Sequence, residues 1–226
     1  RPLVEKYFGA IKRGPVNEPA QAIVPTLSAP KEVVMHDRVA ATTISRYWPV
    51  PGLLDEQLVA IDLGGSVLGG LSSSRLDNAL VRDEKIAVSV SAGLYPLQRV
   101  GLFTVSATVK PGVDPALVEK RLDELVAQYI AEGPRPEELA RAATIEVSQR
   151  IMGLEQVGGF GGKAVALAEG QVYAGDPLFY RKNLNLYATT SPDEVRQAMQ
   201  QWLTRPALQL TLAPGEREAY QGAKPA

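Results

Sequence analysis

The chain has 226 residues, of which 45% are apolar and 22% are charged, and both values are ordinary for a globular protein. Its 24 basic and 25 acidic residues give a formal net charge of −1, so bulk charge points to no nucleic-acid or anionic-membrane partner. The absence of cysteine excludes disulfides, thiolate zinc sites and a cysteine nucleophile, and no stretch reaches the roughly 18 apolar residues that a membrane span needs.

The first thirteen residues have the pattern of a helix. Val4, Phe8 and Ile11 recur at helical spacing, and Gly14-Pro15 ends the segment. The chain does not begin with Met, and charged residues lie where the apolar region of a signal peptide would be. We therefore expect residues 1–13 to be the tail helix of a preceding domain in a longer protein. A chain whose start was removed for expression is the alternative.

Residues 14–30 have the composition of an extended, semi-rigid linker, because prolines alternate with small polar residues. We expect the folded domain to occupy residues 31–214 and a flexible tail to occupy residues 215–226.

The domain is predicted to begin with two strands. Residues 32–36 and 40–48 are rich in β-branched and aromatic side chains, and we expect them to pair about a tight turn at Asp37-Arg38. The prolines of residues 49–52 are expected to end the second strand. Asp55 is then a suitable N-cap for a helix that runs into Gly64-Gly65.

The next segments predict a short helix and a hairpin. Ser72-Ser73-Ser74 opens the helix, and Gly69-Gly70 before it permits a sharp corner and close packing. Residues 86–92 and 102–109 alternate with period two about a turn at residues 95–98, which is typical of paired strands.

The remaining chain is predicted to be mainly helical. Helices begin at Asp114-Pro115, at Pro136 and, with the capping box Ser191 to Glu194, near Pro192. A further helical stretch follows the glycine-rich residues 158–162, and residues 208–212 form a last strand. The order ββααββαα…αβ, preceded by a proline-rich linker, indicates an α+β fold with one mainly antiparallel sheet packed on several helices.

The sequence offers no metal site. A hydrolytic zinc site needs about three protein ligands, typically with two histidines one helical turn apart. His36 is the only histidine and lies in a predicted strand. We interpret His36 as a surface or hairpin residue.

Other catalytic patterns are also missing. The paired carboxylates at residues 83–84, 123–124 and 137–138 are explained by turns, polar helix faces and the helix dipole. Ser72, Ser73 and Ser74 lack the G-x-S-x-G pattern of a nucleophile elbow. Residues 157–164 fail the phosphate-loop pattern at two positions.

Residues 68–92 are the most specific segment of the chain. Leu68 to Leu76, continuing through residues 79–85 into residues 86–92, resembles the "LGGG-SSRL…LRE…LAYSVSA" segment of insulinase/pitrilysin-type zinc peptidases. Relatives of these enzymes include the mitochondrial processing peptidase and the core subunits of the cytochrome bc1 complex. The resemblance extends in order over residues 1–214, and it identifies residues 31–214 as the second, non-zinc domain of one half of such a protein.

The resemblance implies a function for the parent protein and not for this chain alone. In this family two halves close as a clamshell around an unfolded peptide, and zinc is bound by an H-x-x-E-H motif in the first domain of the catalytic half. No part of this chain matches that motif, so the resemblance implies zinc in the parent protein and no cofactor or catalytic residue here. The implied partners are the zinc-bearing domain, the other half of the clamshell and a peptide substrate.

One substrate-contacting residue can be carried over. The non-catalytic half of these enzymes supplies an Arg and a Tyr near the zinc; the Arg aligns with Arg82 and the Tyr with Val88, with one residue fewer between them. Valine cannot donate a hydrogen bond to an oxyanion, so this domain is expected to follow the zinc-bearing domain or to belong to a degenerate half. Arg82 is therefore the candidate for substrate binding, and a helix-end salt bridge is the alternative.

The expected function is that of an inactive C-terminal domain of a zinc metalloendopeptidase, which shapes the substrate chamber and docks the zinc-bearing domain. Bacterial relatives of this type are commonly periplasmic, which suggests the same location. A non-enzymatic assembly subunit of the same fold is the alternative.

Overall fold

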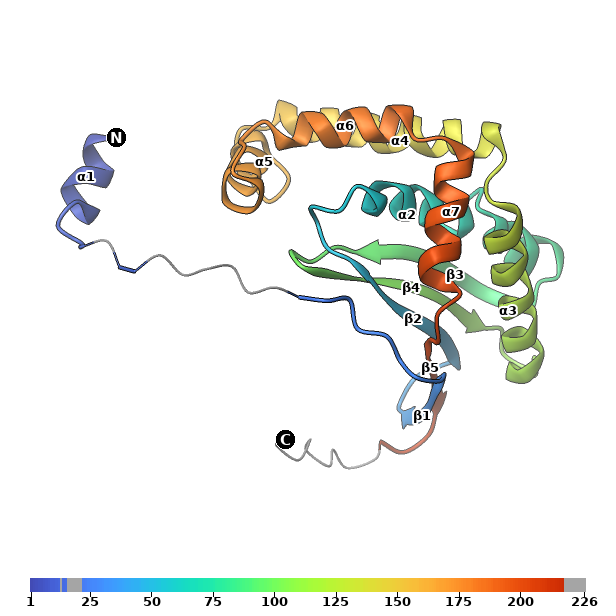
Figure 1. Cartoon of the computed structure of the whole chain (residues 1–226). Coiled ribbons are helices and arrows are strands. Elements are labelled where there is room, and N and C mark those ends of the chain that lie inside the picture. The colour runs from blue at the N-terminus through green and yellow to red at the C-terminus, as the bar shows by residue number, and fades with distance from the viewer. Residues whose placement is uncertain (13, 16–21, 218–226) are drawn as a thin grey trace.

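The computed structural model describes residues 1–12, 14–15 and 22–217. One open sheet of five strands lies against a layer of helices (Figure 1). The elements are α1 (Pro2–Phe8), β1 (Lys31–Asp37), β2 (Thr43–Pro51), α2 (Gln57–Gly65), η1 (Ser66–Gly70), η2 (Asp77–Asp83), β3 (Ala87–Tyr95), β4 (Val100–Val109), α3 (Pro115–Glu132), α4 (Pro136–Glu155), α5 (Lys163–Glu169), η3 (Gly170–Ala174), α6 (Phe179–Thr189), α7 (Pro192–Leu203) and β5 (Leu208–Pro214). The elements labelled η are π-helical turns.

The strand order in the sheet is β1-β5-β2-β4-β3. Three of the four strand pairs are antiparallel, and only β1 and β5 run parallel. The predicted α+β class, the mainly antiparallel sheet and the order of the elements are confirmed. Among the described helices, none combines the length and the hydropathy of a membrane span.

The predicted hairpin of the first two strands is wrong. β1 and β2 follow one another in the chain, but β5 lies between them and pairs with both. The turn at Asp37-Arg38 therefore connects strands that are not neighbours in the sheet. The pairing of β5 is a contact with the far end of the domain, and no local pattern encodes it.

The predicted end of the second strand is also wrong, since β2 continues through Pro49 to Pro51. Pairing with β4 extends to Pro51, whereas pairing with β5 stops at Tyr47. Beyond Tyr47 β2 is thus an edge strand on one side. A proline is tolerated there because no ladder hydrogen bond is required from its nitrogen.

The helix-facing side of the sheet forms the core. Alternate residues of β4 are buried on this side, together with the inward faces of α2, α3 and α7. Among them are Phe103, Val105, Ala107 and Val109. Arg46 of β2 points to the same side, where its Nη2 lies 2.7 Å from Glu119 Oε1 and 2.8 Å from Asp123 Oδ2 of α3. This ion pair fixes α3 across β2.

Glycines in the α2–η1 segment permit close approach to the sheet and to α7. A Cβ on Gly64 would meet the Met199 side chain at 2.7 Å, and a Cβ on Gly69 would meet the Ala92 nitrogen at 2.6 Å. The close packing predicted at Gly69-Gly70 is confirmed.

The opposite side of the sheet has no helix among the described residues (Figure 1). Leu208, Leu210 and Leu212 of β5 pair with Tyr47, Ser45 and Thr43 of β2, which alternate with the buried Ile44 and Trp48. The three leucines therefore point away from the helices, and each is partly exposed. We call the side of the sheet that contains them the uncovered face.

The ends of the chain differ in how they are held. α1 buries none of its residues, and Leu3, Val4, Tyr7 and Phe8 are all more than half exposed. After β5, the N–H of Gly215 donates to the carbonyl oxygen of Asp37 at 3.0 Å. Most of the predicted flexible tail, residues 218–226, lies outside the described residues, as do residues 13 and 16–21 of the predicted helix and linker.

Candidate functional site

The described residues do not fit a zinc ion. They contain no group of three or more His, Cys, Asp or Glu residues that could hold a metal. His36 is exposed on β1, opposite Ala213 of β5. The donor set that the resemblance assigns to zinc is therefore not assembled by this part of the chain.

The carboxylate pairs noted in the sequence form ion pairs within the fold. Asp123 binds the buried Arg46, and Glu84 Oε1 accepts a hydrogen bond from Arg121 Nε at 2.8 Å. Glu138 Oε2 accepts one from Arg75 Nη2, also at 2.8 Å. Each of these contacts joins two separate elements, which is a structural use of the carboxylate.

Arg82, the predicted substrate-binding residue, lies near the end of η2 with 57% of its side chain exposed. Its Nε donates to Asp77 Oδ2 at 2.7 Å and its Nη2 donates to the carbonyl oxygen of Ser72 at 2.5 Å. Val88 lies at a bulge in β3 between Ala87 and Ser89 and is 55% exposed. Arg82 thus makes the helix-end ion pair considered in the sequence and still presents its side chain to solvent.

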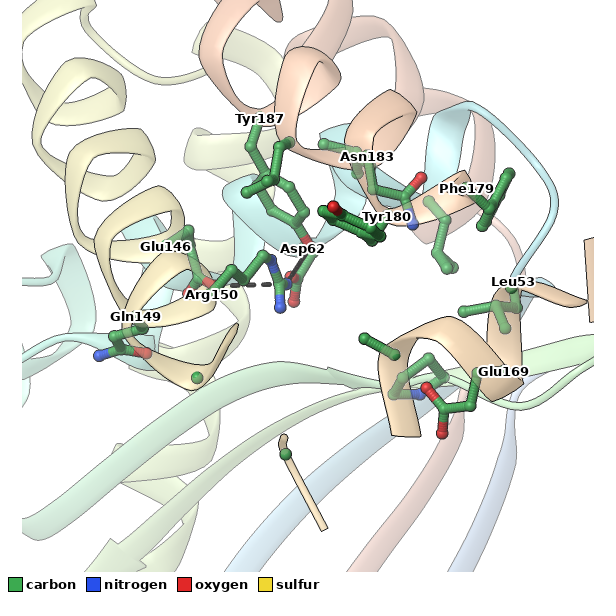
Figure 2. Close-up of a pocket in the computed structure, with 18 of the residues that line it drawn as sticks. Leu53, Asp62, Glu146, Gln149, Arg150, Glu169, Phe179, Tyr180, Asn183 and Tyr187 are labelled. Carbon is green, nitrogen blue, oxygen red and sulfur yellow. Dashed lines mark hydrogen bonds and ion pairs between the residues drawn. The ribbon is translucent and has the colours of Figure 1, made fainter. Parts of the chain in front are cut away.

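The structure contains a cavity that the sequence did not reveal. It has a volume of about 640 Å³ and lies between α2, α4, α6, the α5–η3 segment and the end of the β3–β4 hairpin (Figure 2). Its apolar wall includes Leu53, Leu58, Leu94, Phe179 and Tyr180. We call it the α4–α6 cavity.

Asp62, Arg150 and Tyr187 form a linked group at one side of the α4–α6 cavity (Figure 2). Tyr187 donates its hydroxyl hydrogen to Asp62 Oδ2 at 2.5 Å, and Arg150 Nη2 lies 3.1 Å from the same oxygen. Arg150 also donates to the Tyr187 hydroxyl, and its guanidinium carbon is 4.1 Å from the ring centre. Burial, followed by the charge of Asp62, raises the pKa of Tyr187 above its ordinary value, so Tyr187 acts as a neutral donor.

Glu146 joins the same group from α4. Its Oε2 lies 3.3 Å from Arg150 Nη2, and its Oε1 accepts a hydrogen bond from the Ser66 hydroxyl at 3.2 Å. Burial and the negative charge of Asp62 raise the pKa of Glu146, although Arg150 and Ser66 act in the opposite direction. One arginine is therefore shared by two carboxylates, and the group as a whole carries an excess negative charge.

Two more carboxylates line the cavity, those of Asp55 and Glu169. The predicted N-cap at Asp55 is wrong by one position, since the N-cap of α2 is Glu56. Asp55 Oδ1 still accepts a hydrogen bond from the N–H of Gln57, the first residue of α2, at 2.9 Å. Among the described residues, Glu169 has no ion-pair partner. The charged lining is therefore four carboxylates and one arginine, which favours a cationic guest.

A second cavity, of about 660 Å³, lies between the η2 segment and the junction of α3 and α4. Its charged lining is balanced, with three arginines facing three carboxylates: Arg75, Arg135, Arg141, Asp83, Glu132 and Glu138. Arg75, Arg135 and Glu138 are engaged with one another. This balance gives the second cavity no preference for the charge of a ligand.

The profile of the peptidase M16 inactive domain matches residues 1–146. The chain belongs to the peptidase M16 family. The insulinase-type resemblance of the sequence is thereby confirmed, and the matching model is that of the inactive domain of this family. None of the curated proteins compared with this M16 chain matches it.

Solved structures share the fold of this chain. The M16 chain is similar to a protease from Helicobacter pylori, with 19% identity and a TM-score of 0.80 over 94% of this chain and 51% of the other. It is also similar to a peptidase M16 inactive domain from Pseudomonas fluorescens, with 19% identity and a TM-score of 0.69 over 93% of this chain and 49% of the other. The periplasmic protease PqqL from Escherichia coli is 17% identical, with a TM-score of 0.70 over 95% of this chain and 24% of PqqL. The chain thus spans about half or less of these proteins.

The residues of the α4–α6 cavity could not be found from spacing alone. Asp62, Arg150 and Tyr187 come from three helices that are far apart in sequence. The one available signal is Asp62, which is the single charged residue within the apolar run of α2. A charge in such a run indicates a partner across the helix layer.

Proposed function

We propose that this chain is the non-catalytic C-terminal domain of a zinc metalloendopeptidase, where it docks the zinc-bearing domain and shapes the chamber around an unfolded peptide. Zinc and the hydrolytic water would belong to the parent protein, since the described residues contain no group of three or more His, Cys, Asp or Glu that could hold a metal ion. The membership in the M16 family supports this assignment.

The observation that carries the proposal is the uncovered face of the sheet. Leu208, Leu210 and Leu212 of β5 lie in one row, with Tyr47 of β2 opposite Leu208. Sheets normally bury an apolar face against a second layer, and the described residues provide a layer on the other face only (Figure 1). The row on β5 is apolar, while β2 and β4 place Ser45, Ser106 and Thr108 on the same face. The apolar row is suited to contact with a neighbouring domain.

The N-terminal helix gives independent support for a neighbouring domain. Leu3, Val4, Tyr7 and Phe8 of α1, with Ile11 just beyond it, are between 61% and 70% exposed. A short helix with this composition is not stable alone in water and needs a packing partner. We propose that α1 completes the preceding, zinc-bearing domain.

Arg82 is proposed to contact the substrate in the assembled protein. Its exposed guanidinium lies just before the start of β3, and its two hydrogen bonds to Asp77 and Ser72 leave part of the group available. A periplasmic location is proposed as well, on the ground that PqqL is a periplasmic protease with the same fold.

The test combines this chain with the H-x-x-E-H domain of its own parent protein. We expect the two to form a complex by light scattering and to hydrolyse a quenched fluorescent peptide in the presence of zinc. Leu210→Arg on the uncovered face should weaken the complex at least tenfold. Leu117→Arg should leave it intact, since Leu117 is half exposed on α3.

Three results would contradict the proposal: no complex between the domains, stoichiometric tight zinc binding by this chain in calorimetry, or peptide cleavage by this chain alone. The role of Arg82 is tested in the same assay. Arg82→Ala should raise KM at unchanged stability, whereas Arg181→Ala, a change at another exposed arginine, should not.

A further inference from the structure

The α4–α6 cavity has the size and walls of a ligand site. Its volume of about 640 Å³ falls in the range of roughly 300 to 1,000 Å³ that small-ligand pockets occupy. Leu53, Leu94 and Phe179 supply apolar surface, and Tyr180 and Asn183 of α6 add polar atoms beside it. Figure 2 shows one open space with the side chains of Leu53, Phe179, Tyr180 and Asn183 around it.

The charges around the cavity do not balance. Arg150 already has two ion-pair partners, because its Nη2 lies 3.1 Å from Asp62 Oδ2 and 3.3 Å from Glu146 Oε2. Its guanidinium also lies over the ring of Tyr187. One positive charge is thus divided between two carboxylates, and a guest with a second positive charge would complete the pairing.

Glu169 lies across the cavity from this group (Figure 2). Among the described residues it has no ion-pair partner, and it is exposed at the end of α5. Lys182 of α6 pairs with Glu56 instead, with its ammonium 2.6 Å from Glu56 Oε1. A cation in the cavity would therefore have carboxylates on two sides.

We propose that the α4–α6 cavity binds a cationic group on an apolar stem, such as the side chain of arginine or lysine in a peptide. The charged end would lie between Glu146 and Glu169, and the stem would pack on Phe179 and Tyr180. The face of an aromatic ring also attracts a cation. Tyr180 would therefore contact both the apolar stem and the charged end of the guest.

This inference goes beyond the proposed function, because a site between helices does not depend on zinc or on peptide cleavage. The same chemistry could come from a basic side chain of a peptide or from a free amine, and the two sources can be separated. Binding is measured on the full 226-residue chain without zinc, so a negative result leaves the docking proposal untouched.

The test uses three probes in isothermal calorimetry: acetyl-Leu-Arg-Leu-amide, the same peptide with neutral citrulline in place of arginine, and agmatine. We expect the arginine peptide to bind at least tenfold more tightly than the citrulline peptide, and to weaken as the salt concentration rises. Tighter binding of the peptide than of agmatine identifies a peptide source, and equal or tighter binding of agmatine identifies a free amine.

Matched variants locate the site. Glu169→Gln should weaken the arginine peptide by about three- to tenfold, as expected for loss of one charge pair, and should not affect the citrulline peptide. Glu155→Gln is the control, because Glu155 is exposed on α4 and outside the cavity lining. Amide shifts in nuclear magnetic resonance should centre on Tyr180 and Asn183.

Three outcomes would overturn the inference. The first is no binding of either the arginine peptide or agmatine at millimolar concentration. The second is equal affinity for the arginine and citrulline peptides. The third is an equal effect of Glu155→Gln and Glu169→Gln, which would show a general response to surface charge.

Discussion

The hydroxyl of Tyr187 donates a hydrogen bond to Asp62 Oδ2 at 2.5 Å, and this contact joins α6 to α2. Arg150 of α4 contacts both residues, through a 3.1 Å ion pair with Asp62 and through the face of the Tyr187 ring. Three helices from distant parts of the chain are therefore fixed at one point. The wall of the α4–α6 cavity depends on this point.

We predict that Tyr187→Phe lowers the free energy of unfolding by about 1 to 2 kcal/mol, because the partly buried carboxylate of Asp62 loses its neutral donor. The phenyl ring remains against Arg150, so the helix packing is preserved. Urea denaturation measures the change. Tyr180→Phe is the control: within the described part of the chain, the Tyr180 hydroxyl accepts only a 3.4 Å hydrogen bond from Arg181, and its loss should cost less than about 0.5 kcal/mol. Equal costs at the two positions would refute the assigned role of Tyr187.

Gly69 and Gly93 make a matched pair of glycines. A Cβ on Gly69 would lie 2.6 Å from the backbone nitrogen of Ala92, whereas a Cβ on Gly93 would meet nothing within 4 Å. We predict that Gly69→Ala lowers the free energy of unfolding by about 1 to 3 kcal/mol, because η1 must move away from β3. Gly93→Ala should leave stability unchanged or raise it slightly. Thermal unfolding of both variants measures the change in stability. A Gly69→Ala protein as stable as the unchanged chain would contradict the close packing.

Lys85 occupies a backbone position that favours glycine. It follows the end of η2 with φ of 56°, and it is the only described non-glycine residue with positive φ. The left-handed conformation costs most L-residues roughly 1 to 2 kcal/mol, and glycine is the usual residue just beyond a helix end. We predict that Lys85→Gly raises the free energy of unfolding by about 1 kcal/mol. Lys85→Ala should change it little, and a loss of stability in Lys85→Gly would show that the lysine side chain matters instead.

Glu138 makes stability depend on pH. Burial by itself would raise its pKa, but hydrogen bonds from Arg75 and from the backbone and side chain of Arg135 outweigh burial and lower the pKa to about 2. A carboxyl group with a lowered pKa stabilises the fold above its ordinary pKa near 4.5, and that stability is lost as the pH falls toward 2.

We predict that Glu138→Gln removes about 2 kcal/mol of stability at pH 7 and flattens the loss of stability between about pH 5 and pH 2. Glu137→Gln is the control, since the side chain of Glu137 is 63% exposed. Urea denaturation at several pH values measures both variants. If the Glu138→Gln protein lost as much stability between pH 5 and pH 2 as the unchanged protein, the lowered pKa of Glu138 would be contradicted.

Local signals in the sequence were sufficient for most of the fold. The capping box at Ser191 forms as predicted, Asp114 caps α3, and Gly133 ends α3 with φ of 74°. The hairpin of β3 and β4 also forms, because its two strands are adjacent and its alternation selects the buried face. In these elements the residues that decide the structure lie within a few positions of one another.

The sequence failed where distant segments meet. The pairing of β1 with β5 is not visible in either strand alone, and a tight turn between neighbouring strands was the simplest interpretation. The cavity could not be predicted for the same reason, since Asp62 and Tyr187 are brought together only by the packing of α2 against α6. Asp62 in an apolar run indicates a partner but does not name it.

The insertion of β5 between β1 and β2 has a consequence for synthesis. Within the described residues, β1 pairs with β5 alone, so a growing chain carries β1 without its partner until residue 214 has left the ribosome. Contacts of such sequence separation slow folding, and a strand edge left open in the meantime is prone to wrong association. The pairing of β1 can therefore be completed only after β5 has been synthesised.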